Sequence, residues 1–232
     1  MAHKQKHHAE NEVDTGAVLI DNLRVFWAKN GKKLALVLGA IVVVIGGYFL
    51  YQEYVQKPKV QEALDKSFKA EHYFQVDSIG LALNGDGVNP GFIKIAEKYS
   101  GTPSGKLAKY YAGVCYIKLN QNQQAVKYLK DFSTSSKPIQ QRAYKLLGDA
   151  YGDLGKNEDA LKYYKKAARE FEDDKAASAD ALFNAAYLAQ RVLNKPDEAI
   201  ALYKELKLKF PRNEQGYQVD KYLAQLGVYS VD

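Results

Sequence analysis

The chain of 232 residues is poor in the residue types that build metal sites and catalytic centres. It contains one cysteine, one methionine, one tryptophan and four histidines. Because Cys115 has no second cysteine to pair with, no intramolecular disulfide can form, and cysteine content does not decide the redox compartment. Beyond the N-terminal tail the only histidine is His72. We expect Cys115 to be buried by packing and His72 to be an ordinary surface or packing residue.

Motifs for phosphate binding, calcium binding and nucleophilic catalysis are also missing. Residues 84–91, NGDGVNPG, are rich in glycine, but no Gly-Lys-Ser/Thr follows and no strand precedes them. They also lack the regular acidic ligands of a calcium loop, so a flexible, enlarged turn is the simplest interpretation. The sequence therefore predicts no catalytic residue, no metal ligand and no cofactor. An enzyme, for example one acting on the cell wall, remains a third hypothesis for the function.

Charge of a single sign is not concentrated anywhere. Lysine and arginine total 33 against 27 acidic residues, a formal net charge of +6, and the two signs are interspersed along the chain. Nucleic-acid binding calls for a basic stripe or patch. The composition therefore argues against a nucleic-acid partner.

One long hydrophobic run is present, near the N-terminus. The nineteen residues from Leu34 to Gln52 carry no charge, and eleven of them are Leu, Ile, Val or Phe. As a helix, such a run spans roughly the 30 Å hydrocarbon core of a bilayer. A cleaved signal peptide would have a shorter run and a small-residue cleavage site, and a buried core helix would show polar interruptions. We predict a transmembrane helix over 34–52, with membrane lipid as a partner.

Charged flanks indicate the orientation of this helix. Four basic residues precede the run (Arg24, Lys29, Lys32 and Lys33), whereas acids balance the lysines that follow it. Positive flanks favour the cytoplasm, which predicts a cytoplasmic N-terminus and a large domain outside the cytoplasm. We expect the tail at 1–16 to be disordered. Residues 17–33 have apolar residues at helical spacing. They are either an amphipathic juxtamembrane helix or an extension of the membrane helix.

Residues 57–232 show helical periodicity and internal repeats. The clearest unit has the pattern of a tetratricopeptide repeat, two antiparallel helices packed through small residues and aromatic side chains: Tyr144, Leu147, Gly148 and Tyr151, then Ala160, Tyr164 and Ala167. An earlier copy has Gly113, Tyr116 and Ala125. A later copy has Ala199 and Tyr203. The fold class predicted is all-α: one transmembrane helix followed by a tetratricopeptide-repeat α-solenoid.

The terminal repeats depart from this pattern. Keeping the turn of the third repeat in register puts Tyr187 at the glycine position, so its first helix is either rotated or carries an extra residue. Upstream, a long helix at 59–80, the glycine-rich segment and a short helix at 92–99 suggest a first repeat with an enlarged inter-helix turn. Residues 214–226 are expected to form a capping helix, which covers the apolar face of the last repeat.

The first helix of each repeat is expected to line a surface that binds extended peptides or partner helices. In the clearest repeat this surface would present Arg142, Lys145 and Asp149. In the preceding repeat it would present Tyr110, Val114 and Ile117. Ordinary solvated positions are the alternative interpretation of these six residues.

The segment Val25-Phe26-Trp27-Ala28-Lys29-Asn30-Gly31-Lys32, followed by a glycine-containing span and a helical repeat domain, resembles the YfgM-like ancillary subunits of the bacterial Sec translocon. In that family an aromatic pair, alanine, a charged residue and Asn-Gly-Lys precede the single span in the same way. The specific part of the resemblance is confined to residues 25–33. It implies a cytoplasmic N-terminus, an inner-membrane anchor and a periplasmic domain, with Phe26, Trp27, Lys32 and Lys33 near the membrane or translocon.

Two partners follow from the resemblance: the Sec channel subunits and a membrane-anchored periplasmic chaperone of the peptidyl-prolyl isomerase type. The leading hypothesis is a scaffold that recruits this chaperone, or contacts emerging polypeptides, beside the channel. The second hypothesis is an adaptor of another envelope complex, for secretion or outer-membrane assembly.

Overall fold

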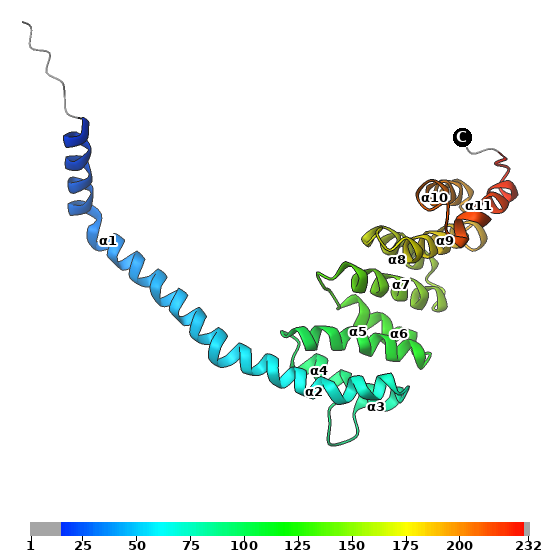
Figure 1. Cartoon of the computed structure of the whole chain (residues 1–232), viewed down its shortest axis with the longest axis horizontal. Helices are drawn as coiled ribbons and strands as arrows, with labels where there is room; N and C mark the ends of the chain where they lie inside the picture. The colour runs from blue at the N-terminus through cyan, green and yellow to red at the C-terminus, as the bar shows by residue number, and fades with distance from the viewer. Residues whose placement is uncertain (1–14, 230–232) are drawn as a thin grey trace, which may run out of the picture. The chain divides into compact units, whose positions relative to one another are not determined.

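The computed structural model describes residues 15–229, in which every regular element is a helix (Figure 1). No strand forms within those residues; a single β-bridge joins Gly85 to Pro90. The chain divides into two compact units, residues 1–57 and 58–232. The all-α fold predicted from the sequence is confirmed.

The first unit is helical from Thr15 onward. Helix α1 spans Thr15–Tyr51 and is followed by a π-helical turn, η1, at Gln52–Gln56. Helix α1 therefore covers the segment predicted at 17–33 and all of the segment predicted at 34–52 except Gln52, with which η1 begins. The tail predicted at 1–16 lies outside the described residues, except for its last two, with which α1 begins.

Apolar side chains of α1 are exposed rather than packed. Leu36 and Val43 are each 74% exposed, and the most apolar 18-residue window has a mean hydropathy of 2.4 with none of its residues buried. Such a helix is long and apolar enough to cross a membrane, a property that anchors and signal sequences share. One N-terminal apolar helix, as predicted, is thus confirmed.

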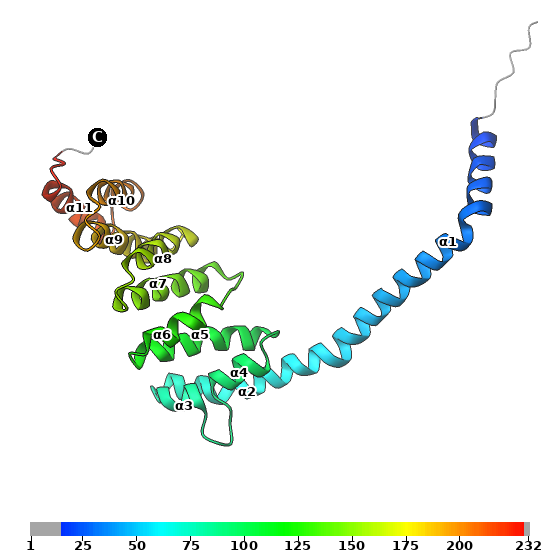
Figure 2. The same ribbon diagram turned by 180° about the vertical axis from the view of Figure 1, so that it is seen from behind.

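The second unit is a stack of helical hairpins that follow one another in chain order (Figures 1 and 2). Three complete hairpins are α5 (Pro103–Lys118) with α6 (Asn122–Lys130), α7 (Lys137–Asp153) with α8 (Asn157–Glu170), and α9 (Lys175–Arg191) with α10 (Pro196–Lys209). Local sequence sets where they begin. Thr102 caps α5 through its hydroxyl, which accepts from the Gly105 amide, and the carboxylate of Asp174 accepts from Ala177 at the start of α9.

Each hairpin closes around one small residue of its first helix. A Cβ added at Gly148 would lie 2.5 Å from the ring of Tyr164, and one added at Gly113 would lie 2.5 Å from Leu129. The absence of a side chain at these two glycines is what lets the second helix approach. Seven residues after each glycine the chain turns with a positive φ, +58° at Asn120 and +69° at Gly155, a conformation that glycine and asparagine tolerate best.

The third hairpin carries its extra residue in the turn, not in the helix. Its turn has four residues, 192–195, where the second hairpin has three, 154–156. The small-residue position is therefore taken by Ala186, which is fully buried, and not by Tyr187, which is 44% exposed. The sequence left open a rotated first helix or an extra residue within it; the structure places the extra residue in the turn that follows, and α9 has the same length as α7.

The expectation of an enlarged turn in the first repeat is wrong. Helix α2 (Lys57–Gln75) turns tightly at Asp77, with φ +56°, into α3 (Ile79–Asn84). Buried Ala70, seven residues before Asp77, takes the small-residue position. The glycine-rich segment instead lies after this turn, between α3 and α4 (Phe92–Lys98), so it interrupts the second helix of the repeat.

Hydrogen bonds hold this inserted loop in a defined conformation, whereas the sequence predicted a flexible turn. The Asp86 carboxylate accepts hydrogen bonds from the Val88 and Asn89 amides at 2.8 and 2.6 Å, and from the Tyr73 hydroxyl at 2.7 Å. These bonds, that from Asn89 first, hold the pKa of Asp86 well below its usual range.

The predicted C-terminal cap is present as α11 (Glu214–Gln225). It buries Val219 and Leu223 against the last hairpin and leaves Tyr217 and Lys221 exposed. A mostly polar outer face at the end of a solenoid protects the apolar face beneath it.

Candidate binding surfaces

The first helices of the three hairpins share one face, which we call the A-helix face. It consists of two rows of structurally equivalent residues. Three residues before the small-residue position stand Tyr110, Lys145 and Phe183; one residue after it stand Val114, Asp149 and Tyr187. All six are at least partly exposed to solvent. Four of them were predicted from the sequence, and Phe183 and Tyr187 were not.

At its α5 end the A-helix face is apolar. The ring of Tyr110 lies 5.5 Å from that of Phe132. Tyr110 and Ile117 both pack against the buried hydrophobic cluster that contains Phe132. Burial raises the pKa of Tyr110. Val114 is half-buried beside them, so this end offers a partly covered apolar surface rather than charge.

At α7 the face is polar and its charges are already paired. The Lys145 ammonium lies 3.1 Å from the Asp149 carboxylate and 3.7 Å from that of Asp180 on α9. The Tyr164 hydroxyl donates to Asp149 at 2.9 Å, and burial, together with the negative charge of Asp149, raises the pKa of Tyr164. Lys145 and Asp149 therefore join three helices to one another. Arg142, three residues before Lys145 on α7 and therefore on the same side of the helix, extends the A-helix face; it is exposed and forms no ion pair with any residue between 15 and 229.

At α9 the face becomes aromatic. The ring of Phe183 lies 5.1 Å from that of Tyr222 and 6.1 Å from that of Tyr187, and Tyr203 stacks on Tyr222 at 5.4 Å. Sequence reasoning missed this cluster because it assigned Tyr187 to the buried glycine position. The longer turn at 192–195 was the signal that would have shifted the register by one residue.

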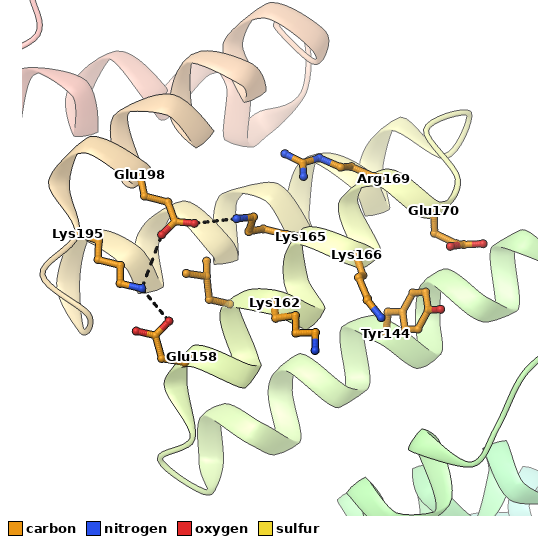
Figure 3. A pocket seen from close by; sticks show the side chains of 10 residues that line it. Tyr144, Glu158, Lys162, Lys165, Lys166, Arg169, Glu170, Lys195 and Glu198 are labelled. Carbon is orange, nitrogen blue, oxygen red and sulfur yellow. Dashed lines mark hydrogen bonds and ion pairs between the residues drawn. The ribbon is translucent and has the colours of Figure 1, made fainter.

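A second concave surface lies on the other side of the hairpins, between α8 and α10 (Figure 3). It is an open groove of about 530 Å³, with Leu161 at its floor and Tyr144 at one end. From α8 it is lined by four basic residues at helical spacing: Lys162, Lys165, Lys166 and Arg169. Sequence reasoning singled out none of these residues.

Ion pairs join the two helices along this groove. Glu198 on α10 lies 2.7 Å from Lys165, and Lys195 lies 2.8 Å from Glu158 and 3.9 Å from Glu198. Hydrogen bonding to Glu158 raises the pKa of Lys195. Figure 3 shows these contacts as a continuous chain on one side of the groove.

Membrane-facing residues predicted on the first unit are exposed. Phe26 and Trp27 are 53% and 57% exposed, and Lys32 and Lys33 are exposed in the same helix. Whether they contact a membrane or a translocon stays a prediction, as do the assigned partner contacts on the A-helix face.

Within residues 15–229 no group of three His, Cys, Asp or Glu side chains is placed to hold a metal ion. Cys115 is fully buried, as predicted, and burial raises the pKa of its thiol to about 12. A thiol with so high a pKa is protonated at neutral pH and is a poor nucleophile.

Two family models match the chain, and both describe tetratricopeptide repeats. One covers residues 107–135, which contain most of α5 and all of α6, and the other covers 145–214, from within α7 to the start of α11. No relative was found among curated proteins. The hairpins are therefore tetratricopeptide repeats, as predicted, which are modules of protein–protein interaction.

Proposed function

We propose that this protein is a membrane-anchored scaffold whose A-helix face binds a segment of another protein. The composition of that face supports this proposal. Apolar groups around Tyr110, an unpaired cation at Arg142 and exposed aromatic rings at Tyr187 follow one another along three stacked tetratricopeptide hairpins. Apolar and aromatic anchors beside a few polar groups are what peptide-binding surfaces use.

The anchor is α1, with the orientation that its flanking charges favour. An uncharged run of nineteen residues inserts favourably into lipid, and the basic residues before it favour a cytoplasmic N-terminus. The solenoid would then stand in the periplasm of a bacterium, tethered to the inner membrane. Phe26 and Trp27 would lie at the cytoplasmic interface, where aromatic side chains are enriched.

The partner class follows from the resemblance of residues 25–33 to the ancillary subunits of the Sec translocon. On this basis the solenoid recruits a membrane-anchored periplasmic chaperone of the isomerase type, or contacts polypeptides that leave the channel. The short membrane-proximal match and the shared architecture support this assignment. An adaptor of another envelope complex would use the same anchor and the same A-helix face.

Affinity purification in mild detergent tests both levels of the proposal. The tagged full chain should recover channel subunits and the chaperone, and Arg142→Glu should reduce that recovery because it reverses the unpaired charge. Lys221→Glu on α11 is the matched control, since it makes the same kind of change on the capping helix.

Each outcome of this purification has a clear meaning. Recovery of a different envelope complex, still sensitive to Arg142→Glu, would replace the Sec assignment but keep the scaffold. Recovery of no protein, or equal loss with both variants, would overturn the binding role of the A-helix face.

A further inference from the structure

We propose that the groove between α8 and α10 is a second docking site, and that it takes an acidic helical segment of a partner protein. The groove lies on the second helices of the hairpins, so this inference does not depend on the function proposed for the A-helix face. We infer the occupant from the charged side chains of the groove, some of which form ion pairs within the protein and some of which do not.

Two of the three carboxylates of the groove are used by the protein itself, and the third, Glu170, forms no ion pair within residues 15–229. Glu158 and Glu198 are occupied by Lys195 and Lys165, and Arg169 is held by Glu205 at 2.8 Å. Hydrogen bonding to Glu205 raises the pKa of Arg169. These pairs fix α8 against α10 and cancel most of the charge on that side.

Two cations are left without a carboxylate. Within the described part of the chain Lys162 and Lys166 form no ion pair, and both are exposed. The Lys166 ammonium is instead positioned over two aromatic rings, 5.3 Å from the centroid of Tyr144 and 5.4 Å from that of Tyr163. Such cation–π contacts restrict the lysine without neutralising it.

The spacing of these two lysines indicates the shape of the ligand. Figure 3 shows Lys162 and Lys166 projecting from α8 toward the same side of the groove. Because they are four residues apart on one helix, they are separated by about 6 Å along its axis. Two carboxylates at positions i and i+4 of a second helix have the same spacing, and an apolar residue between them would reach the floor at Leu161.

A protein segment fits the groove better than a lipid surface or a nucleic acid. The ten lining residues comprise five cations and three carboxylates, a net charge of +2. A dense array of phosphates would meet the three carboxylates as well as the lysines. A helix with two acidic residues on one face can satisfy Lys162 and Lys166 while avoiding the paired side of the groove.

Peptide binding to the full chain in neutral detergent tests the site. The probe is a fluorescent, helix-forming peptide with two glutamates one turn apart and a leucine between them; a peptide of the same composition with its glutamates on opposite faces is the reference. Anisotropy should show binding of the first peptide that weakens as salt is raised. Lys162→Glu with Lys166→Glu should weaken it by about tenfold or more.

The control is Lys204→Glu with Lys221→Glu, which makes the same total charge change at exposed positions outside the groove. It should leave the affinity within about twofold, since these lysines lie outside the contact. Lys162→Gln with Lys166→Gln, which adds no acid, should give an intermediate loss and guards against misfolding of the charge-reversed variant.

Three results would overturn the proposal. The peptide could fail to bind the parent chain, or both double Glu variants could weaken binding equally, which would indicate nonspecific charge attraction. Alternatively, vesicles containing phosphatidylglycerol could bind in a manner that depends on Lys162 and Lys166 while the peptide does not, which would make the groove a lipid site.

Discussion

Apolar residues occupy opposite environments in the two units of this protein. In α1 their side chains are exposed, as at Leu36 and Val43, whereas in the hairpins the same residue types are buried, as at Leu147 and Leu206. Glycines differ in the same way. A Cβ added at Gly46 of α1 would meet nothing within 4 Å, but one added at Gly148 would meet the Tyr164 ring.

This difference shows that the two units are specified by different features of the sequence. As the proposed membrane anchor, α1 requires only an uninterrupted apolar composition, because a bilayer would offer every side of the helix the same solvent. Each hairpin requires particular residues at particular positions, because protein interiors are close-packed. Substitutions should therefore act by charge in α1 and by volume in the hairpins.

Charge in α1 should give the largest effect. Val43→Arg with Val44→Arg should cost about 5–7 kcal/mol of insertion free energy, more than the few kcal/mol that the apolar run supplies. The double variant should move from the membrane fraction of broken cells to the soluble fraction, or be degraded. Val43→Leu is the control and should remain with membranes. Membrane retention of the arginine variant would show that the apolar run of α1 is not what binds the protein to the membrane.

Loss of volume in a hairpin should come next. Leu147→Ala should lower the free energy of unfolding by about 2–5 kcal/mol, because the cavity adds to the lost transfer free energy. Urea denaturation followed by far-UV circular dichroism measures it. Leu36→Ala in α1 should leave the transition of the hairpins in place, and a similar shift in both variants would contradict the account.

Added volume should have a smaller effect. A Cβ at Gly105 would overlap the carbonyl group of Tyr99, and since backbone must move to relieve it, Gly105→Ala should cost about 1–3 kcal/mol. Thermal unfolding detects such a change. Gly46→Ala provides the control, because its Cβ points into open space; an unchanged melting temperature for Gly105→Ala would show that the start of α5 is loosely packed.

The smallest expected effect is that of the Asp86 carboxylate in the second unit, whose contribution to stability should depend on pH. Asp86→Ala should destabilise the protein at neutral pH, because the carboxylate accepts the bonds that hold the loop. Since the folded-state pKa of Asp86 lies below the unfolded value of about 3.9, the stability it adds is present above that value and is lost as pH falls below it. The gap between parent and variant should close on acidification.

Urea unfolding of the parent chain and of Asp86→Ala, from neutral pH to below about 3.9, measures this gap in the free energy of unfolding. Val88→Ala, which keeps every carboxylate and shortens a side chain of the same loop that is 88% exposed, should show no such closure. A gap for Asp86→Ala that is constant with pH would mean that the loop is held by its glycines and not by the carboxylate.

Sequence periodicity was enough to predict the hairpins, the cap and the apolar helix, since each leaves a repeating or continuous pattern. It failed where a single residue changes register. The four-residue turn at 192–195 moved Tyr187 out of the core. The tight turn at Asp77 placed the glycine-rich segment between α3 and α4, within the second half of the first repeat, and not at the turn between the two halves.

The binding surfaces were only partly predictable for a related reason. Arg142 and Val114 could be placed from repeat register alone. The pairing of Lys145 with Asp149 and Asp180, and the neutralisation of Glu158 and Glu198, depend on side chains up to about one repeat apart. No local pattern in the sequence distinguishes a lysine that is paired across a hairpin from Lys162, which is not.

Alkaline carbonate extraction of membranes that contain the full chain determines whether α1 holds the solenoid to a lipid bilayer. Carbonate releases peripheral proteins but leaves spanning helices in place. We expect the intact chain to stay in the membrane pellet. Release of the intact chain into the supernatant would show that α1 does not span the membrane.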